Sequence, residues 1–444
     1  MPPAPIPSPA APTLERAVSR WQIVALALNN VVGGGVFLLP AAAAAVLGAG
    51  SLWAILGAGL AILLVVLCFA EAASRFDRAG GAYLYTRVAF GDLVGFEVGW
   101  ITWLANVAAS AALSAGFAQA LSYFWPAAAG GWSRGLAVAL PLVALTMANV
   151  VGVRSGARTA VVLTLLKLAP LALFILVGLF AAPLAWAGNA APTHPNLGAG
   201  VLLLLFAYSG FENAPAPAGE YQNPRKNVAF ALLAQIAIVT LLYLSVQWVA
   251  LRTLPHLAAS PAPLAEAARL LLGPWGGTLL AVGTAVSILG TNGNQVLAAP
   301  RYLFALARDG FGPAFLAGVH PRFHTPAAAV VVQSAIVLPL ALSGSFASLA
   351  ALSMLALLAT YGGTAAAVVV LRRKPGVEPA AFRLPGGPVI PIAAIVLCAG
   401  LARSAKRDDL LYGAIAVAVG LVLYLLRRAP RPDPETPETP EVLA

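Results

Sequence analysis

The sequence NNVVGGGVF at residues 29–37 interrupts an apolar stretch that is long enough to cross a membrane. Three successive glycines inside a helix cost about 1 kcal/mol each relative to alanine and leave N–H groups uncovered. Lipid offers no hydrogen bonds, so irregular backbone at membrane depth requires a protein-lined or watery cavity. The segment predicts one of two structures. It is either an unwound helix whose restarting half binds an anion, or a site of close packing between helices through small residues.

A second interruption follows in FAYSGFENAPAP at residues 206–217. Gly210 can break the helix, and Pro215 and Pro217 remove two backbone donors. Glu212 is an acid inside this span, where an unpaired charge costs at least about 2.5 kcal/mol. It is either a functional ionisable group or a structural acid that accepts backbone N–H bonds at the helix break.

The composition excludes an ordinary soluble enzyme. Of 444 residues, 60% are hydrophobic and 9% are charged, and the mean hydropathy is +0.87. These charges could not cover the surface of a soluble protein of this size. We expect no nucleic acid partner, because in a membrane protein a net charge of +10 indicates loops that face anionic lipid. Cys68 and Cys398 have no metal-ligand spacing, and neither a metal nor a cofactor is expected.

The apolar stretches predict an all-α polytopic membrane protein with twelve transmembrane helices. The loops between them are short, and strand-like alternation is missing, so a β-barrel is not expected. The predicted spans are residues 21–46, 51–72, 93–124, 135–152, 159–183, 197–218, 228–251, 276–299, 326–342, 346–371, 388–402 and 410–426.

The distribution of Lys and Arg predicts the orientation of these spans. With the N-terminus inside, 19 of the 26 fall in inside segments and 6 outside. This bias predicts a plasma (inner) membrane protein with both termini cytoplasmic, although the cluster at 403–407 opposes it. No cleavable signal peptide precedes Trp21. We expect residues 1–20 to be a disordered cytoplasmic N-terminus and residues 427–444 a disordered tail.

The two interruptions fall in the first and sixth spans, which begin two sets of five. Interrupted helices at matching positions of two halves indicate a transporter with inverted repeats. This predicts a first repeat at about 21–183, a second at about 197–371 and two extra helices at 388–426. Helices 1 and 6 are the discontinuous ones.

Lys167 places an amine within the fifth predicted span, too deep to reach the membrane surface easily. A buried lysine can lose its proton at accessible pH, so Lys167 is a candidate proton carrier or a fixed cation. The alternative is a lysine that bonds free carbonyls of the broken first span and never titrates.

Four motifs in order resemble the amino acid–polyamine–organocation (APC) superfamily. They are GGGVFLLP at 33–40, EAASRFDRAGGAYLYTRVAFG at 71–91, FAYSGFENAPAPAGEYQNPRKN at 206–227, and APRYLFALARDGFGP at 299–313 with HPRFHTP at 320–326. HExxH, Walker A and GxSxG motifs are absent, so no enzyme activity is expected. The resemblance implies the LeuT-like fold of 5+5 inverted repeats and secondary transport of amino acids.

The same resemblance implies a substrate site at the two breaks. Backbone N–H groups of the first break would receive the carboxylate, and carbonyls of the second would receive the ammonium, under an aromatic gate at Phe206. Asn30 would stabilise the first break, and Lys167 would stand at the position of a sodium site. Gly34 replaces a common Ser or Ala, and Gly219 a frequent acid. The implied substrate-binding residues are Asn30, Val32, Gly33, Gly34, Gly35, Phe206, Ala207, Ser209 and Gly210.

The resulting hypothesis is a proton-coupled symporter of neutral amino acids that works by alternating access. Glu212 is the only evident intramembrane acid, and a dicationic substrate would need a partner acid. The substrate side chain would project toward the third, eighth and tenth spans, near Ala109, Asn292, Asn294 and Tyr361. The structural or gating candidates are Glu212, Asn292, Asn294 and Tyr361. The alternatives are an exchanger with Lys167 permanently protonated, an exporter, a channel or nontransporting sensor, and, last, a membrane-embedded enzyme.

Overall fold

The computed structural model describes residues 18–426 except 78–79, 152–156, 183–196, 216–217, 219–220, 324, 404 and 406. Residues 1–17 of the predicted N-terminal tail at 1–20, and the predicted tail at 427–444, lie outside the described residues. Within the described residues the fold is helical, and the only β-type pairing there is an isolated parallel bridge between Val18 and Tyr221.

Fifteen α-helices and five short 3-10 helices make up the described structure. The α-helices are α1 (Arg20–Val31), α2 (Gly34–Leu47), α3 (Ser51–Ala73), α4 (Gly81–Phe90), α5 (Asp92–Leu121), α6 (Gly131–Val151), α7 (Ala157–Ala181), α8 (Leu197–Tyr208), α9 (Pro224–Thr253), α10 (Pro263–Leu272), α11 (Pro274–Arg308), α12 (Ala327–Ser343), α13 (Phe346–Leu371), α14 (Val389–Ala402) and α15 (Arg407–Leu425). The 3-10 helices are η1 (Gly48–Gly50), η2 (Pro126–Ala129), η3 (Phe211–Asn213), η5 (Leu257–Ala259) and η6 (Ala314–Ala317).

Both predicted interruptions are present in the structure. Helix α1 ends at Val31, and α2 begins at Gly34 after a bend of two residues. Helix α8 ends at Tyr208, and Gly210 adopts φ +109° before the single turn of η3. That positive φ explains why a glycine stands at the second break, since other residues are strained there.

Seven helical stretches in the described part of the chain are long and apolar enough to cross a membrane. The chain is therefore a multi-pass membrane protein. Each of the twelve predicted spans coincides with a helix or a broken pair of helices, but several do not meet the length and composition criteria. Helix α1 is halved by its break, α12 and α14 are only 17 and 14 residues long, and α11 carries polar residues along its length.

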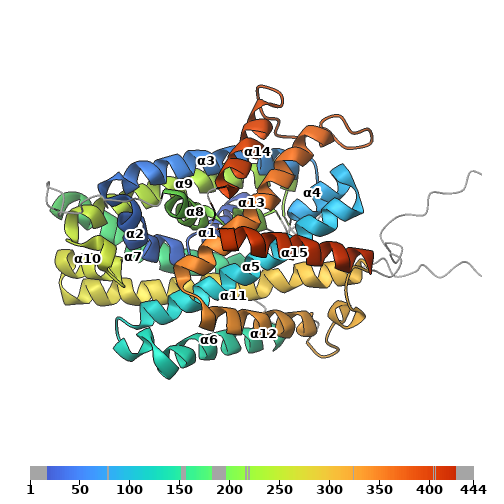
Figure 1. The fold of residues 1–444 in the computed structure, drawn as a ribbon. Coiled ribbons are helices and arrows are strands. Elements are labelled where there is room, and N and C mark those ends of the chain that lie inside the picture. Colours follow the sequence, from blue (N-terminus) through green and yellow to red (C-terminus); the bar gives the residue numbers. More distant parts are fainter. Residues whose placement is uncertain are drawn as a thin grey trace, which may run out of the picture.

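The long helices pack around α5. In the most apolar 18-residue segment of α5, 94% of the residues are buried. Helices α11 and α13 pack along it, while α3 pairs with α9 and α6 with α12 toward the periphery (Figure 1). Large apolar side chains face outward on α6, α7 and α15, as expected for helices that contact lipid. Helix α10 lies at one end of the bundle and α4 at the other (Figure 1).

Two helices were not expected from the sequence, because α4 and α10 fall in predicted loops. Helix α4 carries the YLYTRVAF part of the second motif and is held to the end of α11 by a half-buried acid. Tyr83 donates a 2.6 Å hydrogen bond to Asp309 Oδ2, and Arg87 forms a 3.1 Å ion pair with the same oxygen. Burial, together with the bond to Asp309, raises the pKa of the Tyr83 phenol. The Tyr83 hydroxyl therefore stays protonated and remains a donor. Through Asp309 the motif at 71–91 is bonded to the motif at 299–313.

A second buried acid closes the same end of the bundle. The carboxylate of Glu71, at the end of α3, accepts bonds from Arg75 at 3.1 Å, from Arg372 at 2.7 and 2.6 Å, and from the N–H of Leu384 at 2.9 Å. The bonds to Glu71 raise the pKa of the Arg372 guanidinium. The cluster joins α3 to the end of α13 and to the loop before α14.

Candidate functional site

The two helix breaks lie in direct backbone contact. A Cβ atom on Gly210 would lie 2.6 Å from the carbonyl oxygen of Asn30, and one on Gly35 would lie 3.0 Å from the Cα of Ala207. A real Cβ atom essentially never comes closer than 3.0 Å to another heavy atom. Glycine at these two positions is what lets the unwound segments approach. Both sequence interpretations of the first break, unwinding and close packing, therefore apply to it.

Side chains from neighbouring helices bind the carbonyls that the first break frees. Lys167 of α7 donates to the carbonyls of Asn29 at 3.2 Å and Val32 at 3.3 Å. The hydroxyls of Ser287 and Thr291 on α11 lie 3.3 and 3.4 Å from the same Val32 oxygen. A buried carbonyl without a donor costs free energy comparable to a lost hydrogen bond, so these contacts stabilise the break.

The N–H groups at the start of α2 have no such partner. No hydrogen bond in the described part of the chain uses the N–H of Gly34, Gly35 or Val36, and all three residues are buried. These are the free donors of a helix N-terminus, where the helix dipole favours negative charge. The start of α2 therefore presents buried donors, and an anionic group such as a carboxylate complements them.

The second break presents acceptors, as the sequence predicts. The carbonyl of Phe206 accepts from Ser209 N at 3.1 Å and Ser209 Oγ at 2.7 Å, and that of Ala207 accepts from the Tyr243 hydroxyl at 2.7 Å. The carbonyl of Ser209 has no donor among the described residues. Of these three carbonyls, that of Ser209 is free among the described residues, and those of Phe206 and Ala207 accept bonds from within the protein.

Lys167 is 1% exposed and uses all three of its ammonium donors. Its third bond goes to Thr291 Oγ1 at 2.8 Å. No carboxylate pairs with it in the described part of the chain. The geometry thus contains the contacts of the structural alternative, a lysine that bonds carbonyls of the broken span. A proton carrier in its protonated state would make the same contacts, so both interpretations stay open.

Glu212 belongs to the second break and stabilises it. Its two carboxylate oxygens accept from the N–H of Gly210 at 3.0 and 2.9 Å, and the Tyr361 hydroxyl donates to one of them at 2.9 Å. The group is 2% exposed, and Phe211 and Tyr361 pack beside it with ring centroids 5.1 Å apart. These contacts are those of a structural acid that ties the helix ends together.

We expect replacement of Glu212 by glutamine to preserve function better than replacement by alanine. The glutamine side chain would keep an oxygen for the Gly210 N–H, whereas alanine would strand that buried donor at a cost of about 1–3 kcal/mol. Thermal melting in detergent and uptake into proteoliposomes measure the difference. Loss of uptake in E212Q with an unchanged melting temperature would contradict the structural role.

The two asparagines predicted to face the substrate form contacts between helices. Asn292 of α11 accepts from Ser110 at 2.6 Å and donates to Ser114 at 2.9 Å, both on α5. Asn294 donates to the side chain of Asn30 at 3.2 Å, which supports the predicted role of Asn30 at the first break. The structure thus brings Asn30 and Asn294 together and ties Asn292 to the neighbouring helix.

Apolar side chains surround Gly34, one of the residues predicted to receive the substrate carboxylate. A Cβ atom there would meet Leu113 at 3.3 Å, Ile288 at 3.4 Å and Phe346 at 3.5 Å. The ring of Phe346 packs edge-to-face against Phe206, with centroids 5.9 Å apart. This places the predicted gate residue Phe206 over the same apolar wall.

Sequence reasoning missed three polar residues that complete the breaks: Tyr243, Ser287 and Thr291. The signal for the last two was a hydroxyl pair four residues apart on one face of α11. Tyr243 is a polar ring in the middle of a 30-residue apolar helix and is 5% exposed. A buried tyrosine hydroxyl usually has a hydrogen-bond partner, which was the available clue.

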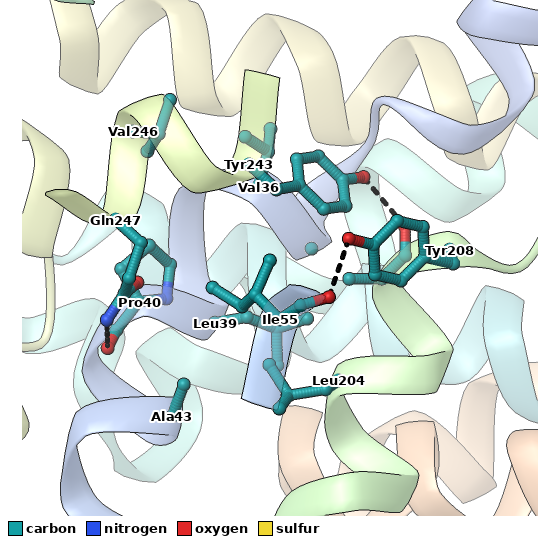
Figure 2. A pocket seen from close by; sticks show the side chains of 12 residues that line it. Val36, Leu39, Pro40, Ala43, Ile55, Leu204, Tyr208, Tyr243, Val246 and Gln247 are labelled. Carbon is teal, nitrogen blue, oxygen red and sulfur yellow. Dashed lines mark hydrogen bonds between the residues drawn. The ribbon is translucent and has the colours of Figure 1, made fainter. Parts of the chain in front are cut away.

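A small cavity of about 20 Å³ lies behind the breaks, between α2, α3, α8 and α9 (Figure 2). Its lining includes Gly35, Ala207, Tyr208, Tyr243 and Gln247. This volume holds about one water molecule, so the cavity is too small for an amino acid. No group of three or more His, Cys, Asp or Glu that could bind a metal occurs in the described ranges.

Comparison with known proteins defines the class of this chain. A family model described as amino acid permease matches residues 18–404. The chain is 30% identical to the methylthioribose transporter of Bacillus subtilis (strain 168), over 93% of this chain and 94% of the relative. It is 30% identical to that organism's serine/threonine exchanger, over 92% and 95% of the two chains. It is 27% identical to its branched-chain amino acid permease, over 93% of each.

The chain belongs to the amino acid permease family. The resemblance to APC transporters drawn from the four motifs is thereby confirmed. The protein is a transporter and not an enzyme.

Proposed function

We propose that this protein is a proton-coupled symporter of neutral amino acids, which it carries across the plasma membrane by alternating access. The observation that carries the proposal is the opposite polarity of the two breaks in contact. Gly34, Gly35 and Val36 present free N–H groups, and Ser209 presents a free carbonyl. A zwitterion complements this arrangement, with its carboxylate on the first break and its ammonium on the second.

The proposed architecture is the LeuT-like fold with twelve spans and both termini cytoplasmic. Each predicted span coincides with a helix, and the breaks fall in the first helix of each predicted repeat. Arg87, its partner Asp309, and Arg372 lie outside the predicted spans, in segments that the charge bias assigns to the cytoplasm, and Glu71, the partner of Arg372, lies at the end of the second span. The names of two relatives, a serine/threonine exchanger and a branched-chain amino acid permease, also support amino acid substrates.

Neutral side chains are proposed because of what surrounds Gly34. Leu113, Ile288 and Phe346 form its wall, and Glu212 at the second break is engaged by Gly210 and Tyr361. A cationic side chain would therefore find no free counter-charge here.

Proton coupling is proposed to run through Lys167. The amine is buried and no described carboxylate neutralises it, yet it holds the carbonyls of the break that receives the substrate. Loss of its proton would remove one donor and loosen the break, which links protonation to the shape of the site. An exchanger is the second candidate, since all three donors have acceptors and suit a permanent charge.

Uptake of a panel of labelled amino acids into proteoliposomes tests the proposal, with and without an inward proton gradient. We expect gradient-stimulated accumulation of neutral amino acids, and little uptake of arginine or polyamines. Flux that requires preloaded lumenal amino acid and ignores the gradient would identify the exchanger. Binding without flux would indicate a sensor, and exclusive uptake of arginine or polyamines would overturn the neutral substrate class.

A further inference from the structure

Helix α15 is attached to the bundle by a small part of its surface. It packs along α5 (Figure 1), and Gly420 is the one buried residue among those that the structure describes in it. The indole of Trp100 on α5 donates a 2.9 Å hydrogen bond to the carbonyl of Ala416. Tyr424 packs against Phe96 of α5, with ring centroids 5.7 Å apart. Helix α5 therefore holds α15 at three successive turns, and Gly420 is at the middle one.

The carboxyl group of Glu97 lies at this middle turn. A Cβ atom on Gly420 would lie 2.7 Å from Oε2 and 2.9 Å from Oε1 of Glu97, and 2.7 Å from Cδ1 of Trp100. A larger residue at position 420 would displace the carboxyl group or the helix. Both carboxyl oxygens are buried and have no hydrogen-bond partner in the described part of the chain. Helix α15 thus covers this group without bonding to it.

The neighbouring elements supply no counter-charge to Glu97. Arg87 on α4 instead pairs with Asp92 at 2.8 Å and with Asp309 at 3.1 Å. No hydrogen bond or ion pair of the described chain joins Glu97 to a charged or titratable side chain on the elements around it. These side chains are Tyr83 and Arg87 on α4, Asp92 on α5, Tyr302, Arg308 and Asp309 on and after α11, Tyr361, Arg372, Arg373 and Lys374 on and after α13, and Tyr424 on α15.

We propose that Glu97 is a proton-binding site that fixes the docking of α15. A buried carboxylate without a donor or a counter-charge costs far more free energy than the neutral acid, so the packed structure takes up a proton here. Ionisation would draw water to the carboxyl group. Helix α15 would then have to move, because it lies directly over both oxygens. Loss of the proton therefore loosens the last helix.

Replacement of Glu97 by glutamine keeps the shape of the neutral acid and cannot ionise. We expect E97Q and the native protein to melt at similar temperatures below about pH 4, where a free glutamate is largely protonated. As the pH rises, unfolding of the native protein releases a proton that E97Q never held, so the native protein becomes the less stable of the two. The ratio of their unfolding constants should grow by up to about tenfold per pH unit while the packed group stays neutral.

The matched control is Asp408→Asn, which removes an exposed acid at the start of the same helix. Its stability should fall with pH in parallel with that of the native protein. The infrared carbonyl band of a protonated carboxyl group gives a second readout. It should be present in the native protein at neutral pH, and E97Q should lack the part due to Glu97. Lower stability of E97Q at every pH, or an unchanged band, overturns the proposal.

A pair of glycine variants covers the case in which E97Q does not fold. Gly420→Ala must displace Glu97 or α15, whereas a Cβ atom on Gly413 of the same helix meets no atom within 4 Å. We expect G420A to admit water to the carboxyl group, so that the infrared band at neutral pH weakens, and G413A to keep the native band. An unchanged band in folded G420A overturns the inference. Neither readout needs an amino acid substrate, so a failure of the proposed function would leave the result standing.

Discussion

Replacing Lys167 with alanine abolishes the stimulation of uptake by a proton gradient and leaves amino acid binding measurable. The change removes the group proposed to carry the proton, strands the carbonyl of Asn29, and leaves that of Val32 to the hydroxyls of α11. A stranded carbonyl costs about 1–3 kcal/mol, so the melting temperature falls as well. Uptake into proteoliposomes across a range of imposed gradients, beside equilibrium binding, measures the two effects separately.

Lys167→Arg is the control that separates coupling from structure. Arginine keeps the charge and the donors but does not release its proton, and Gly290 beside the lysine stem leaves room for the larger group. We expect K167R to exchange amino acids without responding to the gradient. Full gradient-driven uptake in either variant would exclude Lys167 as the proton carrier. If neither the native protein nor K167R responds to the gradient, and K167R transports at the native rate, Lys167 is a fixed cation in an exchanger.

Gly34→Leu eliminates binding of the amino acid. A Cβ atom at this position meets Leu113, Ile288 and Phe346 at distances of 3.3–3.5 Å, but three further carbons would enter a filled space. Overpacking of this kind costs about 1–3 kcal/mol, and the side chain also covers the N–H groups proposed to receive the carboxylate. We expect a loss of affinity of at least about 100-fold, since both effects add.

Two variants control this result. Gly34→Ala adds only the tolerated Cβ atom and should bind with a modest loss. Gly57→Leu makes the same change on α3 at a glycine with no other atom within 4 Å of its would-be Cβ, so it should bind and transport normally. Normal affinity in folded G34L would place the carboxylate site elsewhere.

The positions of the helices could be predicted because apolar length is a strong signal in a membrane. The breaks were also visible, since Gly33 to Gly35 and Gly210 disrupt an otherwise uniform helix pattern. Helices α4 and α10 were missed because each is only 10 residues long and lies between spans, where hydropathy gives no signal. Fewer than twelve stretches meet the length and composition criteria because the breaks shorten two of the predicted spans, α12 and α14 are short, and α11 carries polar residues.

The partners of the breaks were harder to predict than the breaks. The depth of Lys167 left two interpretations open, a proton carrier and a lysine that bonds carbonyls of the first span, and the structure contains bonds to these carbonyls. Nothing in the sequence places Tyr243 opposite both Val31 and Ala207, because that contact depends on how α9 crosses two helices. Asn292 was expected to face the substrate and is bonded to two serines of α5, since a polar residue alone does not tell which neighbour it faces.

The carboxylate of Glu71 constrains the order in which this protein can be assembled. Its partner Arg372 lies 301 residues further along the chain, and Leu384 lies 313 residues further. Until Arg372 and Leu384 have been synthesised, Arg75 is the only one of these partners available to the carboxylate. We expect the end of α3 to reach its final packing only after the tenth predicted span has emerged. A chain that stops before Arg372 would expose this acid and should be recognised by membrane quality control.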